Sequence, residues 1–341
     1  MKFLINGYFG FDNAGDEAVL AAMLADLRSL SPNATFVATS SNSAQTREMH
    51  GCEAIGRQAP RELFGALQGC DVFISGGGSL VQDVTSFRNV MYYTMLLRLA
   101  KMLGKKTMVY AHGVGPLRLA KSRRAARRGF SRADIITVRD PESATLLSEI
   151  GVTKAVEITA DPVWNLKFQP QPKQAKTWGV ALRSWPGEDQ SGLARLVGAL
   201  RATANANGAT LRFLPMQPGP DHEILQGLTT AGEILETRGA HPSEILALTS
   251  SFELVLAMRL HALIFAASAG VPVVAFNYDP KVASLAKLLG APLLNSPSVN
   301  DLAALPSLIS EAKAVSPDVL AAFRAKAKRN SELAVSLISC S

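Results

Sequence analysis

Cysteine and aromatic residues are scarce in this 341-residue chain, and long hydrophobic runs are absent from its sequence. Cys52, Cys70 and Cys340 are odd in number and have no metal-ligand spacing, so neither a disulfide framework nor a metal cluster is expected. Aromatic residues make up 6%, which argues against a stacking surface for single-stranded nucleic acid. No window reaches the ~20 apolar residues needed to span a bilayer. The first residues lead into a strand-like segment and do not resemble a signal peptide, so a cytoplasmic location is expected.

Charged residues are also few, at 18%, beside 48% hydrophobic residues, as in a folded protein with large cores. Lysine and arginine number 35 and aspartate and glutamate 28, which gives a net charge of +7. This excess favours an acidic partner: a phosphorylated small molecule, an anionic membrane surface or nucleic acid. At roughly 150 residues per domain, the length predicts two domains.

Short apolar runs alternate with longer amphipathic stretches, as expected of parallel strands joined by helices. The predicted strands are Lys2–Gly7, Thr35–Ser40, Asp71–Ser75, Thr107–His112, Ile135–Arg139, Ala155–Ala160, Trp178–Leu182, Thr210–Leu214, Leu254–Met258 and Val271–Phe276. A proline-rich stretch, Asp161–Thr177, interrupts the pattern and is the predicted linker. The fold class is therefore α/β, with two doubly wound domains facing each other across a cleft, over residues 1–165 and 175–315.

The first candidate site is the loop after the first strand, Asn6-Gly7-Tyr8-Phe9-Gly10-Phe11-Asp12-Asn13-Ala14-Gly15-Asp16-Glu17. Its glycines have phosphate-loop spacing, but Asp16 and Glu17 stand where that loop needs Lys and Ser or Thr. Two acids at a helix start suit a hydroxyl-rich ligand better than a phosphate. The structural alternative is a capped turn with Asn13 or Asp16 as the N-cap.

Three more strand ends in the first half carry glycines or cations. They are Ser75-Gly76-Gly77-Gly78-Ser79, Tyr110-Ala111-His112-Gly113-Val114-Gly115-Pro116 and Val138-Arg139-Asp140. Open α/β sheets bind ligands at the carboxyl ends of their strands, so His112 is expected at the mouth of the cleft. A purely structural turn explains the three glycines equally well.

A basic segment, Lys121–Arg132, follows these motifs. At helical spacing Arg124 and Arg128 share one face, and Arg123 and Arg127 share another. Such a helix is predicted to contact anionic lipid or a diphosphate, and a solvated helix face is the structural alternative.

The strongest candidate site lies in the second half, where an apolar strand runs into Met258-Arg259-Leu260-His261 and an alanine-rich helix. Free N–H groups at a helix start, a guanidinium and an imidazole together form an anion site. Arg183 and Lys281 follow two other predicted strands. If the sheet is parallel, these side chains converge on one pocket for a small, highly charged anion.

These motifs together resemble the polysaccharide pyruvyl transferase family, over nearly the whole chain and in the right order. The similarity is greatest to the branch that modifies cell-wall polymers for surface-layer anchoring. It implies a GT-B-like fold with two Rossmann-type domains, in which residues 316–341 form a helix that packs back on the N-terminal domain. It also implies phosphoenolpyruvate as co-substrate, a pyruvate ketal across two sugar hydroxyls as product and release of phosphate, with no cofactor or metal.

The resemblance assigns residues as well. Phosphoenolpyruvate binding falls to the C-terminal domain through Arg183, Arg259, Leu260 and His261, with Lys281, Arg139 and His112 as further donor-side or catalytic residues. Our hypothesis for the chemistry is that His261 or Lys281 is the acid, and that Asp16 or Glu17 is the base or orients the sugar hydroxyls. The expected acceptor-binding residues of the N-terminal domain are Gly7, Tyr8, Asn13, Asp16, Glu17, Gly77 and Gly78.

The implied acceptor is an N-acetylmannosamine unit on a lipid diphosphate. The protein would then lie peripherally at the inner face of the cytoplasmic membrane, with Arg123, Arg124, Arg127 and Arg128 near the diphosphate or the anionic surface. No nucleic-acid partner is expected, and a homo-oligomer is compatible with the sequence.

Two other functions remain open. A nucleotide-sugar glycosyltransferase of the same fold needs an acid for the ribose, and Asp279 is the candidate. A non-enzymatic module would bind membranes or nucleic acid through Arg123–Arg132, and its binding would fall steeply with salt.

Overall fold

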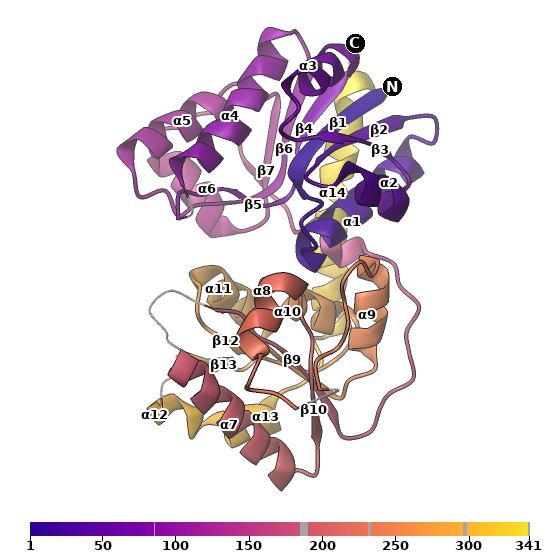
Figure 1. Ribbon diagram of the computed structural model, residues 1–341. Helices are drawn as coiled ribbons and strands as arrows, with labels where there is room; N and C mark the ends of the chain where they lie inside the picture. The colour runs from indigo at the N-terminus through magenta and orange to yellow at the C-terminus, as the bar shows by residue number, and fades with distance from the viewer. Residues whose placement is uncertain (85, 185–189, 231–232, 296–298, 340–341) are drawn as a thin grey trace. The chain divides into compact units, whose positions relative to one another are not determined.

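The computed structural model describes residues 1–84, 86–184, 190–230, 233–295 and 299–339 (Figure 1). The chain divides into two compact units. The first unit consists of Met1–Phe11, Asp16–Leu166 and Ala322–Ser341, and the second of Asp12–Gly15 and Lys167–Ala321. The boundary after Leu166 lies inside the proline-rich stretch predicted as the linker.

Eight parallel strands form the sheet of the first unit, in the order β3-β2-β1-β4-β6-β7-β8, with β5 paired to β6. They are β1 (Lys2–Phe9), β2 (Thr35–Ser40), β3 (Glu53–Gly56), β4 (Val72–Ser75), β5 (Gly78–Val81), β6 (Lys106–Val114), β7 (Ile135–Val138) and β8 (Glu157–Ile158). The central strands β1, β4 and β6 are buried along nearly their whole length. Their continuous apolar runs are what parallel strands covered on both faces require.

The helices of this unit alternate with the strands. They are α1 (Ala14–Leu30), α2 (Ser43–His50), α3 (Pro60–Gly69), α4 (Phe87–Met102), α5 (Ala120–Phe130) and α6 (Pro141–Glu149), followed by the 3₁₀ turn η1 (Pro162–Asn165). Local sequence sets several helix starts: Asp140 caps α6 by accepting the Ser143 N–H at 2.7 Å, and Pro141 occupies the first turn.

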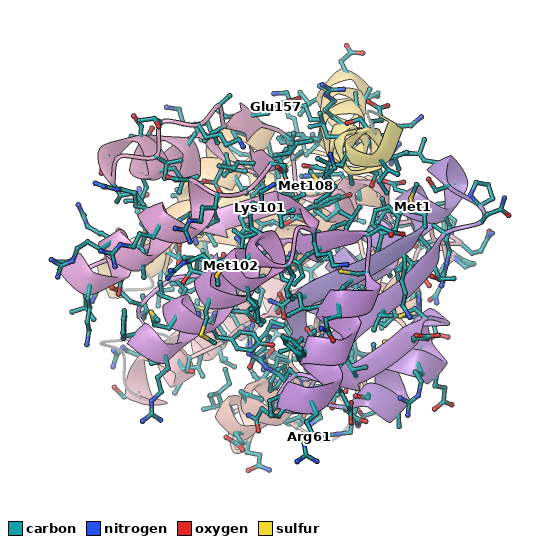
Figure 2. The ribbon with its side chains drawn as sticks, turned by 90° about the horizontal axis from the view of Figure 1, so that it is seen from above. Met1, Arg61, Lys101, Met102, Met108 and Glu157 are labelled. Carbon is teal, nitrogen blue, oxygen red and sulfur yellow. The ribbon has the colours of Figure 1, made fainter. Side chains whose placement is uncertain are left out.

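The C-terminal helix α14 (Pro317–Ser339) completes the first unit from Ala322 onward. Buried Asn330 accepts hydrogen bonds from Thr137 Oγ1 at 2.6 Å and Thr159 Oγ1 at 2.7 Å, and donates one to the Ala160 carbonyl. Figure 2 labels Glu157 beside this helix, where it pairs with Arg329 at 2.9 Å. The helix is thus joined to the ends of β7 and β8 by the buried contacts of Asn330 and by one exposed ion pair.

The second unit has a five-stranded parallel sheet in the order β10-β9-β11-β12-β13. Its strands are β9 (Thr177–Ala181), β10 (Thr210–Phe213), β11 (Leu254–Ala257), β12 (Val273–Phe276) and β13 (Leu293–Leu294). Its helices are α7 (Gln190–Ala206), α8 (Pro218–Leu225), α9 (Pro242–Ser250), α10 (Leu260–Ser268), α11 (Pro280–Leu289), α12 (Val299–Leu302) and α13 (Leu305–Glu311). The α/β prediction is confirmed in both units.

Candidate active site

In the first unit the predicted motifs lie at the carboxyl edge of one sheet. Asn6 of β1 is in register with Ser75 of β4, and the loop after β1, the glycine turn after β4 and the residues after β7 all follow from this edge. Parallel strands present ligand sites at this edge. The alternation of strands and helices along the sequence is therefore enough to bring the candidate residues to this edge.

The two acids of the first loop have different surroundings. Glu17 is buried, with Oε1 accepting the Gly10 N–H at 2.7 Å and Oε2 lying 2.9 Å from His50 Nε2. Both oxygens are thus engaged inside the protein, and Glu17 fixes the loop against α2. Asp16 is only half-buried. Burial is the main cause that raises the pKa of the Tyr8 hydroxyl, and the charge of Asp16 raises it further. The charge of Arg57 partly lowers it again.

The glycine turn, Gly76–Gly78, is closely packed. Gly78 begins β5 with a φ of +97°, and a Cβ there would lie 2.9 Å from Asp16 Oδ1. A side chain at Gly78 would be strained by its backbone and would displace the Asp16 carboxylate. The turn therefore has a structural reason for glycine and also borders the candidate acid.

His112 and Arg139 are more enclosed than expected. His112 is fully buried, with Nε2 3.2 Å from Ser75 Oγ and its ring edge-on to Phe130, so the expected open position at a cleft mouth is wrong. Arg139 donates to Asp161 at 2.6 Å and to Ser79 Oγ at 2.9 Å, and its side chain is 6% exposed. Arg139 comes directly after β7, which ends at Val138, and therefore lies at the carboxyl edge of the sheet. Both residues belong to the first unit.

The predicted basic segment forms α5, which packs beside α4 (Figure 1). Arg123, Arg124, Arg127 and Arg128 are exposed. Arg123 Nε donates to the Leu117 carbonyl at 2.9 Å. The helix therefore presents a basic outer face while its small residues pack inward.

In the second unit, Arg259 is the N-cap residue of α10 and lies two residues after the end of β11. Its Nη2 donates to Asp221 Oδ1, and Asp221 Oδ2 accepts the N–H groups of Met216 and Gln217, both at 2.9 Å. Asp221 is buried, whereas the Arg259 side chain is 12% exposed. The buried carboxylate therefore fixes a guanidinium at the start of α10.

Arg183 lies at the same sheet edge, because β9 and β11 are in register at Ala181 and Ala257 and each arginine follows two residues later. Arg183 Nη1 donates to Tyr278 Oη at 3.2 Å, and its guanidinium lies 5.0 Å from the centre of the Tyr278 ring. Tyr278 follows β12, the strand beside β11. Three adjacent strands thus bring two guanidinium groups to one edge.

His261 and Lys281 lie in the first turns of α10 and α11, and both are half-buried. Asp279 is the N-cap of α11, and its Oδ1 accepts the Lys281 N–H at 2.9 Å. The acid considered for a nucleotide ribose therefore serves as a helix cap. The second unit provides two guanidiniums, an imidazole, an ammonium and two helix starts, a composition that suits an anion with several charges.

Sequence reasoning missed two residues of the second unit's candidate site, Asp221 and Tyr278. Asp221 follows two prolines and a glycine, Pro218-Gly219-Pro220, and Tyr278 lies within Asn277-Tyr278-Asp279, so neither carries a motif. The available signal for Asp221 was indirect: Arg259 lies inside an apolar run, and a cation there needs a buried partner.

Among the described residues, no group of three or more His, Cys, Asp or Glu side chains has the arrangement of a metal site. Across the same residues, no helix has the length and apolar character to cross a membrane.

The polysaccharide pyruvyl transferase family profile matches residues 13–280. The chain belongs to this family. Membership supports transfer of a pyruvyl group to a polysaccharide as its activity. A comparison with curated protein sequences finds no match.

Solved structures show the same fold at low sequence identity. UDP-GlcNAc 2-epimerase from Methanocaldococcus jannaschii superposes with a TM-score of 0.67 at 11% identity, covering 98% of this chain and 100% of that one. The Neisseria meningitidis UDP-GlcNAc 2-epimerase bound to UDP-GlcNAc gives 0.64 at 14%, covering 100% of both chains. A lipopolysaccharide outer core galactosyltransferase gives 0.55 at 13%, covering 98% and 99%. This pyruvyl transferase family member therefore has a GT-B-like fold.

Proposed function

We propose that the protein moves the pyruvyl group of phosphoenolpyruvate onto two hydroxyls of an N-acetylhexosamine, N-acetylmannosamine in the first instance, in a lipid-linked cell-wall polysaccharide precursor. The observation that carries the proposal is the pair of guanidiniums at one edge of the second sheet, Arg259 fixed by Asp221 and Arg183 fixed by Tyr278. Phosphoenolpyruvate has a carboxylate and a phosphate, and two guanidiniums match two such groups.

The chemistry needs one proton donor and two hydroxyl nucleophiles. Protonation of the methylene carbon makes C2 electron-poor, and the first sugar hydroxyl adds there and loses its proton. The second hydroxyl then displaces phosphate from C2 and loses its proton too, so that one released proton restores the acid and the other leaves with the phosphate. The products are the ketal and inorganic phosphate, with no change of oxidation state. We assign the acid role to His261 or Lys281 and the handling of hydroxyl protons to Asp16. Arg139 and His112 then support the first unit's edge from within.

Glu17 has a different role in this proposal from the one the sequence suggested. Because both of its oxygens are engaged with Gly10 and His50, it holds the loop that presents Asp16. Gly7 and Tyr8 belong to β1, Asn13 lies in the loop after it, and Gly77 and Gly78 belong to the glycine turn; we retain all five as acceptor-side residues.

The test is a phosphate-release assay with phosphoenolpyruvate and a panel of N-acetylhexosamines linked to lipid or nucleotide diphosphates. The expected result is release that depends on both substrates, and a fall of about 100-fold or more in Lys281→Met or His261→Ala. Lys287→Met, an exposed cation in the last turn of α11, is the matched control. Release of UDP from a UDP-sugar, without use of phosphoenolpyruvate, would instead establish a glycosyltransferase.

The exposed arginines of α5 support a second part of the proposal, contact with an anionic membrane surface. Co-sedimentation with vesicles containing phosphatidylglycerol tests it. Replacing Arg124 and Arg128 by glutamine is expected to reduce binding, and binding is expected to weaken as salt rises. Equal binding to neutral vesicles would exclude this contact.

A further inference from the structure

Arg57, at the turn after β3, lies among aromatic rings. Its guanidinium carbon is 4.8 Å from the ring centre of Tyr92, 5.2 Å from that of Phe11 and 5.8 Å from that of Tyr8. The Tyr8 and Phe11 rings stack on each other, with centres 4.0 Å apart and planes at 6°. In a chain with 6% aromatic residues, three rings around one cation is a marked concentration.

Among the residues that the structure describes, no carboxylate forms an ion pair with Arg57 within 4.0 Å. Ring faces attract a cation but carry no full negative charge, so the guanidinium keeps its capacity to bind an anion. Its backbone is fixed, since the Arg57 N–H donates to the Ser40 carbonyl at 2.9 Å.

A second donor lies beside the same tyrosine. Asn6 is fully buried, and its Oδ1 accepts from Thr39 Oγ1 at 2.8 Å and from Tyr92 Oη at 3.1 Å. Its Nδ2 has no hydrogen-bond partner within the described residues. Buried donors without an acceptor are rare in folded proteins, so this amide points to an acceptor oxygen supplied from outside the chain.

The Asp16 carboxylate acts on the Tyr8 hydroxyl as well. Burial is the main cause that raises the pKa of Tyr8. The charge of Asp16 raises it further and the charge of Arg57 lowers it, so both charges lie near that ring. The first unit therefore has a carboxylate for hydroxyl groups and a guanidinium for an acidic group, with stacked rings next to the guanidinium. Sugar rings pack readily against aromatic faces of this kind.

We propose that Arg57, with Asn6, Tyr8, Phe11 and Tyr92, binds an anionic group of the sugar acceptor, either a phosphate or a carboxylate. This inference rests on the proposed function, because that function makes the bound sugar an acceptor. It assigns residues to a negative charge close to the sugar that receives the pyruvyl group: Arg57 and the side chains around it. Arg57 is then a residue that determines specificity, and the basic face of α5 has a separate role.

The test is calorimetric binding to the full-length protein with three octyl probes: the neutral glycoside of N-acetylmannosamine, its octyl diphosphate ester and the octyl glycoside of its uronate. The wild type is expected to bind a charged probe more tightly than the neutral one. Arg57→Met is expected to weaken binding of the charged probe by about 10- to 100-fold, with little effect on the neutral one. Arg57→Lys is expected to retain part of the preference because it keeps the charge.

Arg61→Met, at an exposed position labelled in Figure 2, is the matched control and is expected to behave as the wild type. Loss of affinity for the diphosphate probe alone identifies a phosphate, and loss for the uronate alone identifies a carboxylate. Equal affinity of wild type and Arg57→Met for every probe overturns the inference. So does an equal loss for charged and neutral probes in both Arg57 variants, because the role of Arg57 would then be structural.

A parallel titration with phosphoenolpyruvate separates this inference from the proposed function. If the wild type binds no phosphoenolpyruvate but prefers a charged probe through Arg57, the proposed function fails and the anion site stands. If phosphoenolpyruvate binds, and is lost in Arg259→Met, while Arg57→Met leaves the charge preference intact, the anion site fails and the proposed function stands.

Discussion

Asp221 holds Arg259 with one carboxylate oxygen and the backbone of Met216 and Gln217 with the other. The aspartate is buried, and the arginine begins α10. The guanidinium therefore has a fixed direction before any ligand arrives, and under the proposed function an anion would bind to it without a further loss of side-chain freedom.

Asp221→Asn is expected to raise the KM for phosphoenolpyruvate by about 10-fold or more, because the new amide presents a donor to Arg259 in place of an acceptor. Initial rates of phosphate release check this. Loss of a buried charge partner is also expected to lower the free energy of unfolding, by about 3 kcal/mol. An unchanged KM in a folded variant would mean that Arg259 does not need this partner.

Tyr278 contacts Arg183 through its hydroxyl and its ring, and two variants separate these contacts. Tyr278→Phe keeps the ring and is expected to raise the KM for phosphoenolpyruvate by only about 2- to 5-fold. Tyr278→Ala removes both contacts and is expected to raise it by about 10-fold or more. Identical effects of the two variants would contradict a role for the ring.

Asp16 and Glu17 are adjacent acids with opposite expected phenotypes. Asp16→Asn is expected to lower kcat by about 100-fold or more while the fold is unchanged, because under the proposed function it removes the group assigned to the hydroxyl protons. Glu17→Gln is expected to lower thermal stability, since its carboxylate accepts from Gly10 and lies beside His50 in the interior. Kinetics and thermal unfolding of both variants check the pair. A stable Glu17→Gln protein with no turnover would reverse the two assignments.

Asn330→Ala is expected to loosen the end of the chain, because it leaves the buried hydroxyls of Thr137 and Thr159 without their shared acceptor. Hydrogen exchange in peptides from α14 is expected to accelerate by about 10-fold or more, as a loss of about 2 kcal/mol implies. Ser336→Ala, at an exposed position of the same helix, is the control. Equal exchange rates in the two variants would show that Asn330 does not hold α14 against the sheet.

Cys52 and Cys70 are expected to react slowly with iodoacetamide, because burial raises the pKa of each thiol to about 11. At pH 8 only on the order of one thiol in a thousand is then ionised, and the thiolate is the reactive form. The alkylation rate of a Cys340→Ser protein is expected to rise with pH toward 11 and to be far higher at pH 8 in concentrated urea. Cys340 lies outside the described residues. Rapid alkylation of the folded protein at pH 8 would show that burial does not raise the pKa of these thiols.

The sequence predicts the alternation of strands and helices because its apolar runs and helix starts are local signals. Strand β2, for example, has the predicted bounds, Thr35–Ser40. Two strands of the first sheet, β3 and β5, were missed: each has four residues, and Gly78–Val81 begins in a glycine turn. The edges that hold the candidate residues follow from parallel strand order, so the second unit's arginines could be grouped in advance.

The contacts that decide what each side chain can do could not be predicted in the same way. Glu17 and His50 are far apart in sequence and meet only after folding, and so do Arg259 and Asp221. His112 was expected to be open, yet it is enclosed by Ser75 and Phe130. Burial and pairing depend on the three-dimensional packing of several elements, and no short motif records them.

Helix α14 also affects how the protein forms during synthesis. Its residues from Ala322 onward belong to the first unit, yet the ribosome produces them only after the second unit. The hydroxyls of Thr137 and Thr159 and the hydroxyl of Tyr110, which bonds Ser331 at 2.6 Å, await partners from the end of the chain. Until Ala322 and the residues after it have been made, the sheet of the first unit lacks the helix that packs on it, and the second unit can complete its fold first.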